Sequence, residues 1–196
     1  MENIITFCEK THTYWLGSVK IPGVSEIIEG VGLMDAKAKQ FYTQYHSDRG
    51  TAVHAATVMI DNGTLDESSV DPEIVGYLEA YKKFLVEYEP MWLKSEYLVF
   101  DKKLFYAGRL DRYGYLCAMQ GVVDIKTGQK TKWHAIQLAL YALAMGNYFA
   151  PDALVFGLYL HKDGSFKASR DLVNYTDPEI FKVAEAATRL FHWRQK

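Results

Sequence analysis

The hydrophobic and polar positions of this chain follow a helical rhythm before Pro90 and mostly a strand rhythm after it. From Asp71 to Pro90, apolar residues recur three or four positions apart, which is typical of one face of an amphipathic helix. Helices are also predicted over Ser25–Gly32 and Asp48–Gly63, each N-capped by its first residue, and over Asp35–Tyr45, Trp133–Tyr148 and Pro178–Trp193. Strands are predicted over Ser95–Phe100, Leu104–Leu116, Gly121–Thr127 and Ala153–His161, and a hairpin that turns at Gly17 over Thr13–Gly23.

The order of these elements predicts an α/β fold in which helices flank a mixed sheet. The segment Ala153–His161 is apolar almost throughout, which indicates a strand buried on both faces. No repeat or linker divides the chain, so we expect one domain over residues 1–196. Within it, residues 1–48 would form the N-terminal hairpin and helices, and residues 49–196 the core.

Composition gives the chain no strong electrostatic character, because its formal net charge is −2. A nucleic-acid partner therefore requires a local positive surface, and Lys126, Lys130 and Lys132 form one candidate cluster. The alternative is that these are solvated loop lysines. No apolar run is long enough to span a membrane and no secretion signal is visible, so a cytoplasmic setting is expected. The two cysteines do not have metal-ligand spacing.

The segment from Asp111 to Lys126 contains the residues that predict a metal site. Side chains alternate along a strand, so Asp124 and Lys126 share one face. If the chain reverses around Cys117-Ala118, Asp111 lies across from Asp124 at about 5 Å. At an effective dielectric constant of about 20, two such carboxylates repel each other by roughly 3 kcal/mol. A bound Mg²⁺ or Mn²⁺ would convert this repulsion into coordination, so the pair predicts a metal site.

The alternative interpretation is that these charges form ordinary ion pairs at strand ends. In that case Asp111 would pair with Arg109 or Arg112, and Asp124 would pair with Lys126. An acid-x-lysine triplet alone is a weak motif, and only the hairpin geometry makes it specific.

Four segments in this order resemble the PD-(D/E)XK nuclease superfamily, in its RecB-like and phage-exonuclease branch. They are Gly50–His54 (a glycine-x-x-x-histidine motif), Ala107–Asp111 (a strand that ends in an aspartate), Val123–Gly128 (Asp-x-Lys followed by Thr-Gly), and Gln137 with Tyr141 (a glutamine-x-x-x-tyrosine helix). The resemblance extends from Gly50 to about Leu160. It implies a restriction-endonuclease-like core preceded by N-terminal helices.

Carried over to this chain, the resemblance implies a role for each motif residue. Asp111, Asp124, His54 and the Ile125 carbonyl would ligate the metal, and Glu96 resembles a further acid that several relatives use. Lys126 would orient the attacking water and offset charge in the transition state. Gln137 and Tyr141 would steady the site or a DNA phosphate, although both are also explained by helix packing. An imidazole ligand suits Mn²⁺ better than Mg²⁺.

The resulting hypothesis is a metal-dependent deoxyribonuclease, most specifically an exonuclease acting in phage or bacterial recombination or repair. It would use one or two Mg²⁺ or Mn²⁺ ions, take a single strand or a duplex end as substrate, and work with phage or host recombination proteins. No iron–sulfur cluster is expected, because two cysteines cannot supply four ligands. Tyr14 or Trp15 would stack on a base, unless the N-terminal hairpin simply packs on the domain. The competing hypotheses are a non-catalytic DNA-binding module and a hydrolase of small phosphorylated substrates.

Overall fold

The computed structural model describes residues 5–34, 44–146, 153–169 and 179–196. Its centre is a five-stranded sheet with the strand order β4-β5-β6-β7-β8. The strands are β4 (Met91–Asp101), β5 (Tyr106–Leu116), β6 (Met119–Lys126), β7 (Leu154–Leu160) and β8 (Phe166–Ser169). Strands β6 and β7 pair in parallel and the other neighbours are antiparallel, so the predicted mixed α/β sheet is confirmed.

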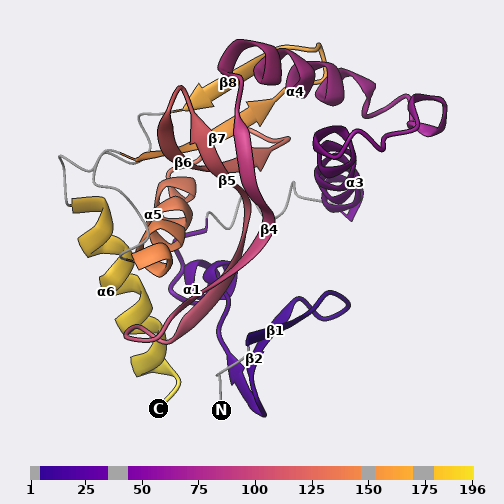
Figure 1. Cartoon of the computed structure of the whole chain (residues 1–196). Coiled ribbons are helices and arrows are strands. Elements are labelled where there is room, and N and C mark those ends of the chain that lie inside the picture. Colours follow the sequence, from indigo (N-terminus) through magenta and orange to yellow (C-terminus); the bar gives the residue numbers. More distant parts are fainter. Residues whose placement is uncertain (1–4, 35–43, 147–152, 170–178) are drawn as a thin grey trace.

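Helices cover both faces of this sheet (Figure 1). One face carries α1 (Val24–Gly30), α5 (Trp133–Met145) and α6 (Glu179–Arg194), and the other carries α3 (Gln44–Asp61) and α4 (Val75–Tyr88). Each face has its own buried apolar cluster, and strand alternation assigns residues to one or the other. Val122 belongs to the cluster beneath α5, whereas Val123 and Ile125 belong to the cluster beneath α4.

A small second sheet precedes α1 in the sequence. It contains β1 (Ile5–Cys8), β2 (Thr13–Leu16) and β3 (Val19–Ile21), all antiparallel. The predicted hairpin and its turn are confirmed, because Gly17 has a φ of +61° between β2 and β3. Strand β1 was not predicted. Gly23 also forms a bridge to Ala107 of β5, which ties this small sheet to the main one.

Helix beginnings were the least accurate predictions. Gly23, not Ser25, is the N-cap of α1, and its N–H lies 3.5 Å from the Glu26 carboxylate. Asp48 lies inside α3, which is already helical at Gln44, so it is not a cap. Capping contributes only about 1 kcal/mol, and packing of the helix outweighs it. The expected helix over 35–45 falls largely outside the described residues.

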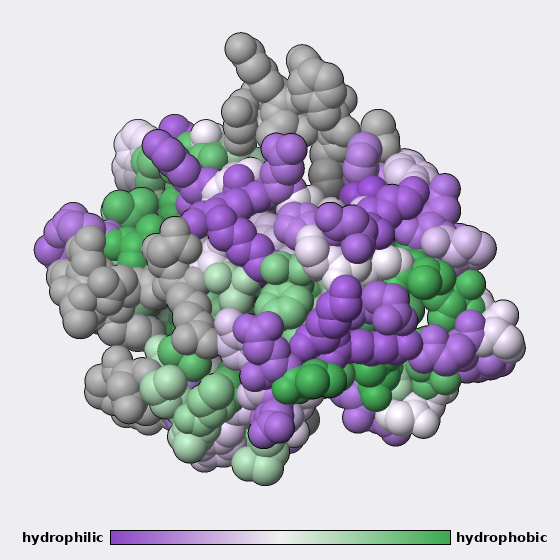
Figure 2. All heavy atoms as spheres, turned by 90° about the horizontal axis from the view of Figure 1, so that it is seen from above, coloured by the Kyte–Doolittle hydropathy of each residue, from purple (hydrophilic) through white to green (hydrophobic). Residues whose placement is uncertain are grey.

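The remaining boundaries differ by a few residues. Helix α4 begins at Val75 instead of Asp71, because Asp71 caps a preceding turn through the Glu73 N–H at 2.9 Å. Strand β4 is longer than predicted, and β8 was not predicted. Among the described residues, no helix combines the length and hydrophobicity needed to cross a bilayer. In Figure 2, hydrophilic side chains occupy much of the centre of the face shown, and hydrophobic ones gather in separate groups.

Candidate metal centre

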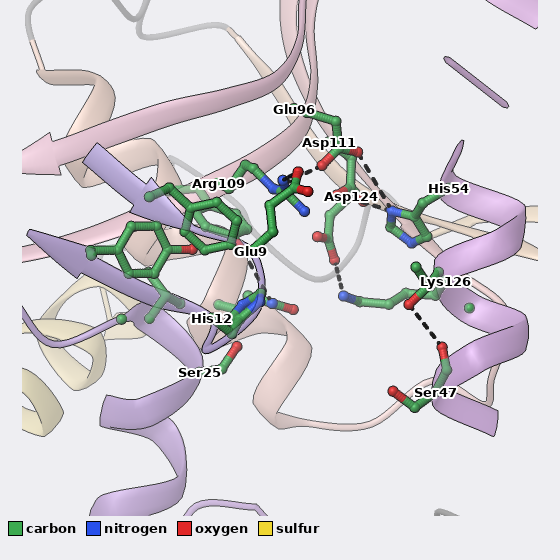
Figure 3. A pocket seen from close by; sticks show the side chains of 18 of the residues that line it. Glu9, His12, Ser25, Ser47, His54, Glu96, Arg109, Asp111, Asp124 and Lys126 are labelled. Atoms are coloured by element: carbon green, nitrogen blue, oxygen red, sulfur yellow. Dashed lines mark hydrogen bonds and ion pairs between the residues drawn. The ribbon is translucent and has the colours of Figure 1, made fainter. Parts of the chain in front are cut away.

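A cavity of about 620 Å³ lies where α3, the sheet strands β4 to β6, α5 and the N-terminal sheet meet (Figure 3). All the side chains that the sequence proposed for catalysis line it, as does every proposed side-chain metal ligand. They are His54, Glu96, Asp111, Asp124, Lys126, Gln137 and Tyr141. The side chain of Ile125 points into the opposite layer, as expected for its position on the strand.

The β5–β6 hairpin has the predicted geometry. The chain reverses at Cys117 and Ala118, which both have positive φ angles (50° and 65°). The ladder runs from Leu116–Met119 to Arg112–Val123 and ends there, one position before Asp111 and Asp124. The Asp111 carboxylate also accepts a 2.5 Å hydrogen bond from the Ile125 N–H. Both aspartates are buried and line the same cavity.

Glu96 reaches the same point from β4 through an unusual backbone conformation. Its neighbours pair with β5 as Ser95–Arg112 and Tyr97–Leu110, so Glu96 stands opposite Asp111. Glu96 itself has a φ of +50°, a left-handed conformation that is uncommon for a residue with a Cβ atom. Strain of this kind inside a strand is typical of functional sites.

His54 of α3 contacts residues of β4, β5 and β6 at the cavity wall. Its Nδ1 atom lies 3.3 Å from Asp111 Oδ1 and 3.8 Å from Glu96 Oε1, and its Nε2 atom lies 3.0 Å from the Ile125 carbonyl oxygen. Burial lowers the pKa of His54, but the charge and hydrogen bond of Asp111 together with the hydrogen bond to Glu96 outweigh burial and raise that pKa to about 10. Burial raises the pKa of Asp111, but the charge and hydrogen bond of His54, the Lys126 charge and the Ile125 N–H together hold it at about 2. The two groups form a charged pair in which Asp111 is buried and His54 is partly exposed.

Asp124 carries the second carboxylate and contacts Lys126 Nζ as an ion pair. Burial raises the pKa of Asp124 to about 6, although the Lys126 ammonium acts in the opposite direction. The ion pair offered as an alternative interpretation is therefore present for Asp124. It is absent for Asp111, because Arg109 Nε pairs with Glu96 at 3.0 Å and Arg112 pairs elsewhere.

The donor set is suited to a divalent cation. One ligand atom each from His54, Glu96 and Asp111 lie within 4.8 Å of one another. Among the described residues, Glu96 Oε1 is buried and accepts no hydrogen bond, and His54 Nδ1 and Arg112 Nη1 each lie 3.8 Å from it. A buried carboxylate oxygen of this kind is costly unless a cation compensates it. Asp124 Oδ2, in contrast, already contacts the Lys126 ammonium. One imidazole and two carboxylates could therefore hold a metal ion, and Asp124, which the sequence also proposed as a ligand, is not among these three residues.

Gln137 and Tyr141 come from α5 and close the cavity floor. The Gln137 amide donates to the Tyr141 hydroxyl at 3.3 Å, while Gln137 Oε1 is buried without a described donor. Gly108 makes room for the tyrosine, because a Cβ atom at Gly108 would lie 2.7 Å from the Tyr141 ring. The presence of glycine at position 108 of the Ala107–Asp111 motif thus has a steric reason. Tyr14 is also buried in the wall, whereas Trp15 is 36% exposed.

Two arginines of β5 were not assigned a role from sequence beyond pairing with Asp111. Arg109 lines the cavity, and Arg112 is fully buried behind it. The spacing of both residues around Asp111 was visible, but their partners lie on other elements. Lys130 and Lys132 of the proposed basic cluster are exposed in the segment between β6 and α5.

Comparison of the chain with protein-family models and with curated proteins found no match.

Proposed function

We propose that this protein is a metal-dependent deoxyribonuclease of the PD-(D/E)XK type, with a restriction-endonuclease-like core, and that it acts as an exonuclease. The observation that carries the proposal is the convergence of His54, Glu96, Asp111, Asp124 and Lys126 on one cavity. The sequence motifs predicted this convergence for residues that come from four different elements. A bound divalent ion would act there as a Lewis acid and lower the pKa of a coordinated water.

The residues of the cavity would have separate roles in this reaction. Asp111, Asp124 and Glu96 would hold the ion by carboxylate oxygens, with His54 and the Ile125 carbonyl completing the set. Lys126 stands beside Asp124 and would place its ammonium against the attacking water and the developing phosphate charge.

Gln137 would present its buried carboxamide oxygen to the same space. It is fixed there by its hydrogen bond to Tyr141. This arrangement would orient the attacking water and the scissile phosphate before the reaction begins.

The test is digestion of end-labelled single-stranded and duplex DNA, beside a covalently closed circle, with Mn²⁺, Mg²⁺ or EDTA. Wild-type protein should degrade the linear substrates only with metal and spare the circle. Asp124→Asn and Lys126→Ala should each lower the rate by at least about a hundredfold, which is the usual effect of removing one acid–base or electrostatic group.

Matched controls come from exposed charges far from the cavity. Glu87→Gln on α4 and Lys103→Ala in the β4–β5 turn should leave the rate unchanged. Full activity of the Asp124 or Lys126 variant would refute the proposed roles. Tight DNA binding without cleavage by the wild type would instead favour the non-catalytic binding module.

A further inference from the structure

Arg109 is a cation in the cavity wall that the proposed chemistry does not use. It lies on β5 two residues before Asp111 and is 27% exposed. Among the described side chains that line the cavity, Arg109 and Lys126 are the ones with a permanent positive charge. Lys126 is paired with the buried Asp124, whereas one partner of Arg109 is the exposed Glu9, which an entering anion could replace.

The guanidinium of Arg109 is held in place from two sides. Its central carbon lies 4.5 Å from the centroid of the Phe7 ring on β1, and its Nε atom lies 3.0 Å from Glu96 Oε2. Both contacts restrict the orientation of the planar group. A preorganised guanidinium loses little conformational entropy when it binds an oxyanion.

The same guanidinium also contacts the carboxylate of Glu9, which is largely exposed to solvent. Arg109 Nη1 lies 3.3 Å from Glu9 Oε1, and the Glu9 side chain is 83% exposed in the turn between β1 and β2. An ion pair with one partner so exposed contributes little to stability. A phosphate offers the same charge and a better match to a guanidinium, so it can displace this carboxylate.

We infer that Arg109 binds a backbone phosphate of the DNA strand, and that Glu9 occupies this phosphate position in the free protein. The inference rests on the proposed nuclease function and names the residue that holds the strand beside the metal group. Glu96 links the two sites, since its Oε2 atom contacts Arg109 and its Oε1 atom lies 3.8 Å from His54 Nδ1. A phosphate bound to Arg109 would therefore lie next to Glu96, which is one of the proposed metal ligands.

The experiment measures binding of a fluorescent single-stranded oligonucleotide by anisotropy, in Ca²⁺ and at several NaCl concentrations. Arg109→Gln should weaken binding by about tenfold and reduce the slope of log Kd against log [NaCl] by about 0.7. Arg109→Lys, which keeps the charge, should retain most of the salt slope. Lys103→Gln, an exposed cation outside the cavity, is the matched control and should change neither quantity.

Glu9→Gln gives an independent test because its side chain is exposed and its loss does not threaten folding. It should tighten binding by about two- to threefold, and this gain should vanish in the Arg109→Gln background. Mn²⁺ affinity is measured for every variant, so that an indirect effect through Glu96 is recognised: weaker DNA binding with unchanged Mn²⁺ affinity supports the inference.

Wild-type cleavage together with unchanged DNA binding in Arg109→Gln and Glu9→Gln overturns the inference while the proposed function stands. A wild-type protein that neither binds nor cleaves DNA overturns both.

Discussion

Replacing Asp61 by alanine tests whether the buried ion pair between Asp61 and Arg112 supports the proposed metal ligands. Arg112 is fully buried, and its Nε atom lies 2.7 Å from Asp61 Oδ2 on α3. The Tyr81 hydroxyl of α4 donates to the same carboxylate at 2.8 Å. Asp61→Ala removes the close counter-charge of the buried Arg112 guanidinium and leaves the Glu96 carboxylate, whose Oε1 atom lies 3.8 Å from Arg112 Nη1.

The expected loss of stability is large for a single substitution. An unpaired buried charge costs about 3 to 5 kcal/mol, and the lost acceptor of the Tyr81 hydroxyl costs about 1 kcal/mol more. A domain of this kind is usually stable by about 5 to 15 kcal/mol in total. The variant should therefore lose a considerable part of its free energy of unfolding.

The same arginine also supports the backbone of two proposed metal ligands. Arg112 Nη1 donates to the Asp111 carbonyl oxygen at 2.8 Å. Its Nη2 atom donates at 2.9 Å to the Thr57 hydroxyl, which in turn donates to the His54 carbonyl oxygen at 2.8 Å. Movement of Arg112 in Asp61→Ala should therefore weaken Mn²⁺ binding as well as folding.

Urea unfolding followed by circular dichroism, with and without Mn²⁺, measures both effects. The matched control is Glu67→Ala, since Glu67 pairs with Lys82 at the same 2.7 Å distance but is 64% exposed. That variant should lose less than about 1 kcal/mol. Equal losses in the two variants would refute the argument that burial of Arg112, and not the ion pair itself, sets the magnitude.

Two further predictions concern the site. The pKa of Asp124 is raised to about 6 by burial, so in the metal-free protein this group makes the free energy of unfolding fall as pH rises from about 4 to about 6. Stabilisation by Mn²⁺ should grow over the same range and further towards about pH 9, because the ion must displace protons from Asp124 and from His54, whose pKa is about 10. Equal Mn²⁺-induced shifts of Tm at about pH 5 and about pH 8 would contradict this. Gly108→Ala should push the Tyr141 ring from its place and lower activity and stability together, by about 1 to 3 kcal/mol in the free energy of unfolding. An unchanged Tm in that variant would show that the ring has room to move.

The sequence predicted most of the fold where local patterns were strong. The β5–β6 hairpin was predicted with its turn, because alternating side chains fix the register once the reversal is placed. Strands β1 and β8 were missed because each has only four residues, and such short segments owe their strand conformation to neighbouring strands. The cap predicted at Asp48 was wrong because local capping is weak beside the packing of a long helix.

In the candidate site, too, local patterns predicted some residues and missed others. Asp111, Asp124 and Lys126 could be placed together from strand geometry, because they belong to one hairpin. His54 and Glu96 came only from motif resemblance, since no local rule brings a helix and an edge strand to the same point. The pairing of Arg109 with Asp111, which the alternative interpretation offered, is not observed, because a strand pattern shows which face a side chain takes but not which distant residue it meets.

By itself, the amino-acid sequence determined most of the elements, the turn of the acidic hairpin and the carboxylates that this hairpin carries. Only the tertiary structure decided that His54 and Glu96 complete this group, that Arg112 is buried behind it, and that Arg109 faces Glu9 instead of Asp111. The physical reason is the distance along the chain over which each interaction acts. Backbone hydrogen bonds and side-chain alternation act between near neighbours, whereas burial and charge pairing depend on where separate elements pack in space.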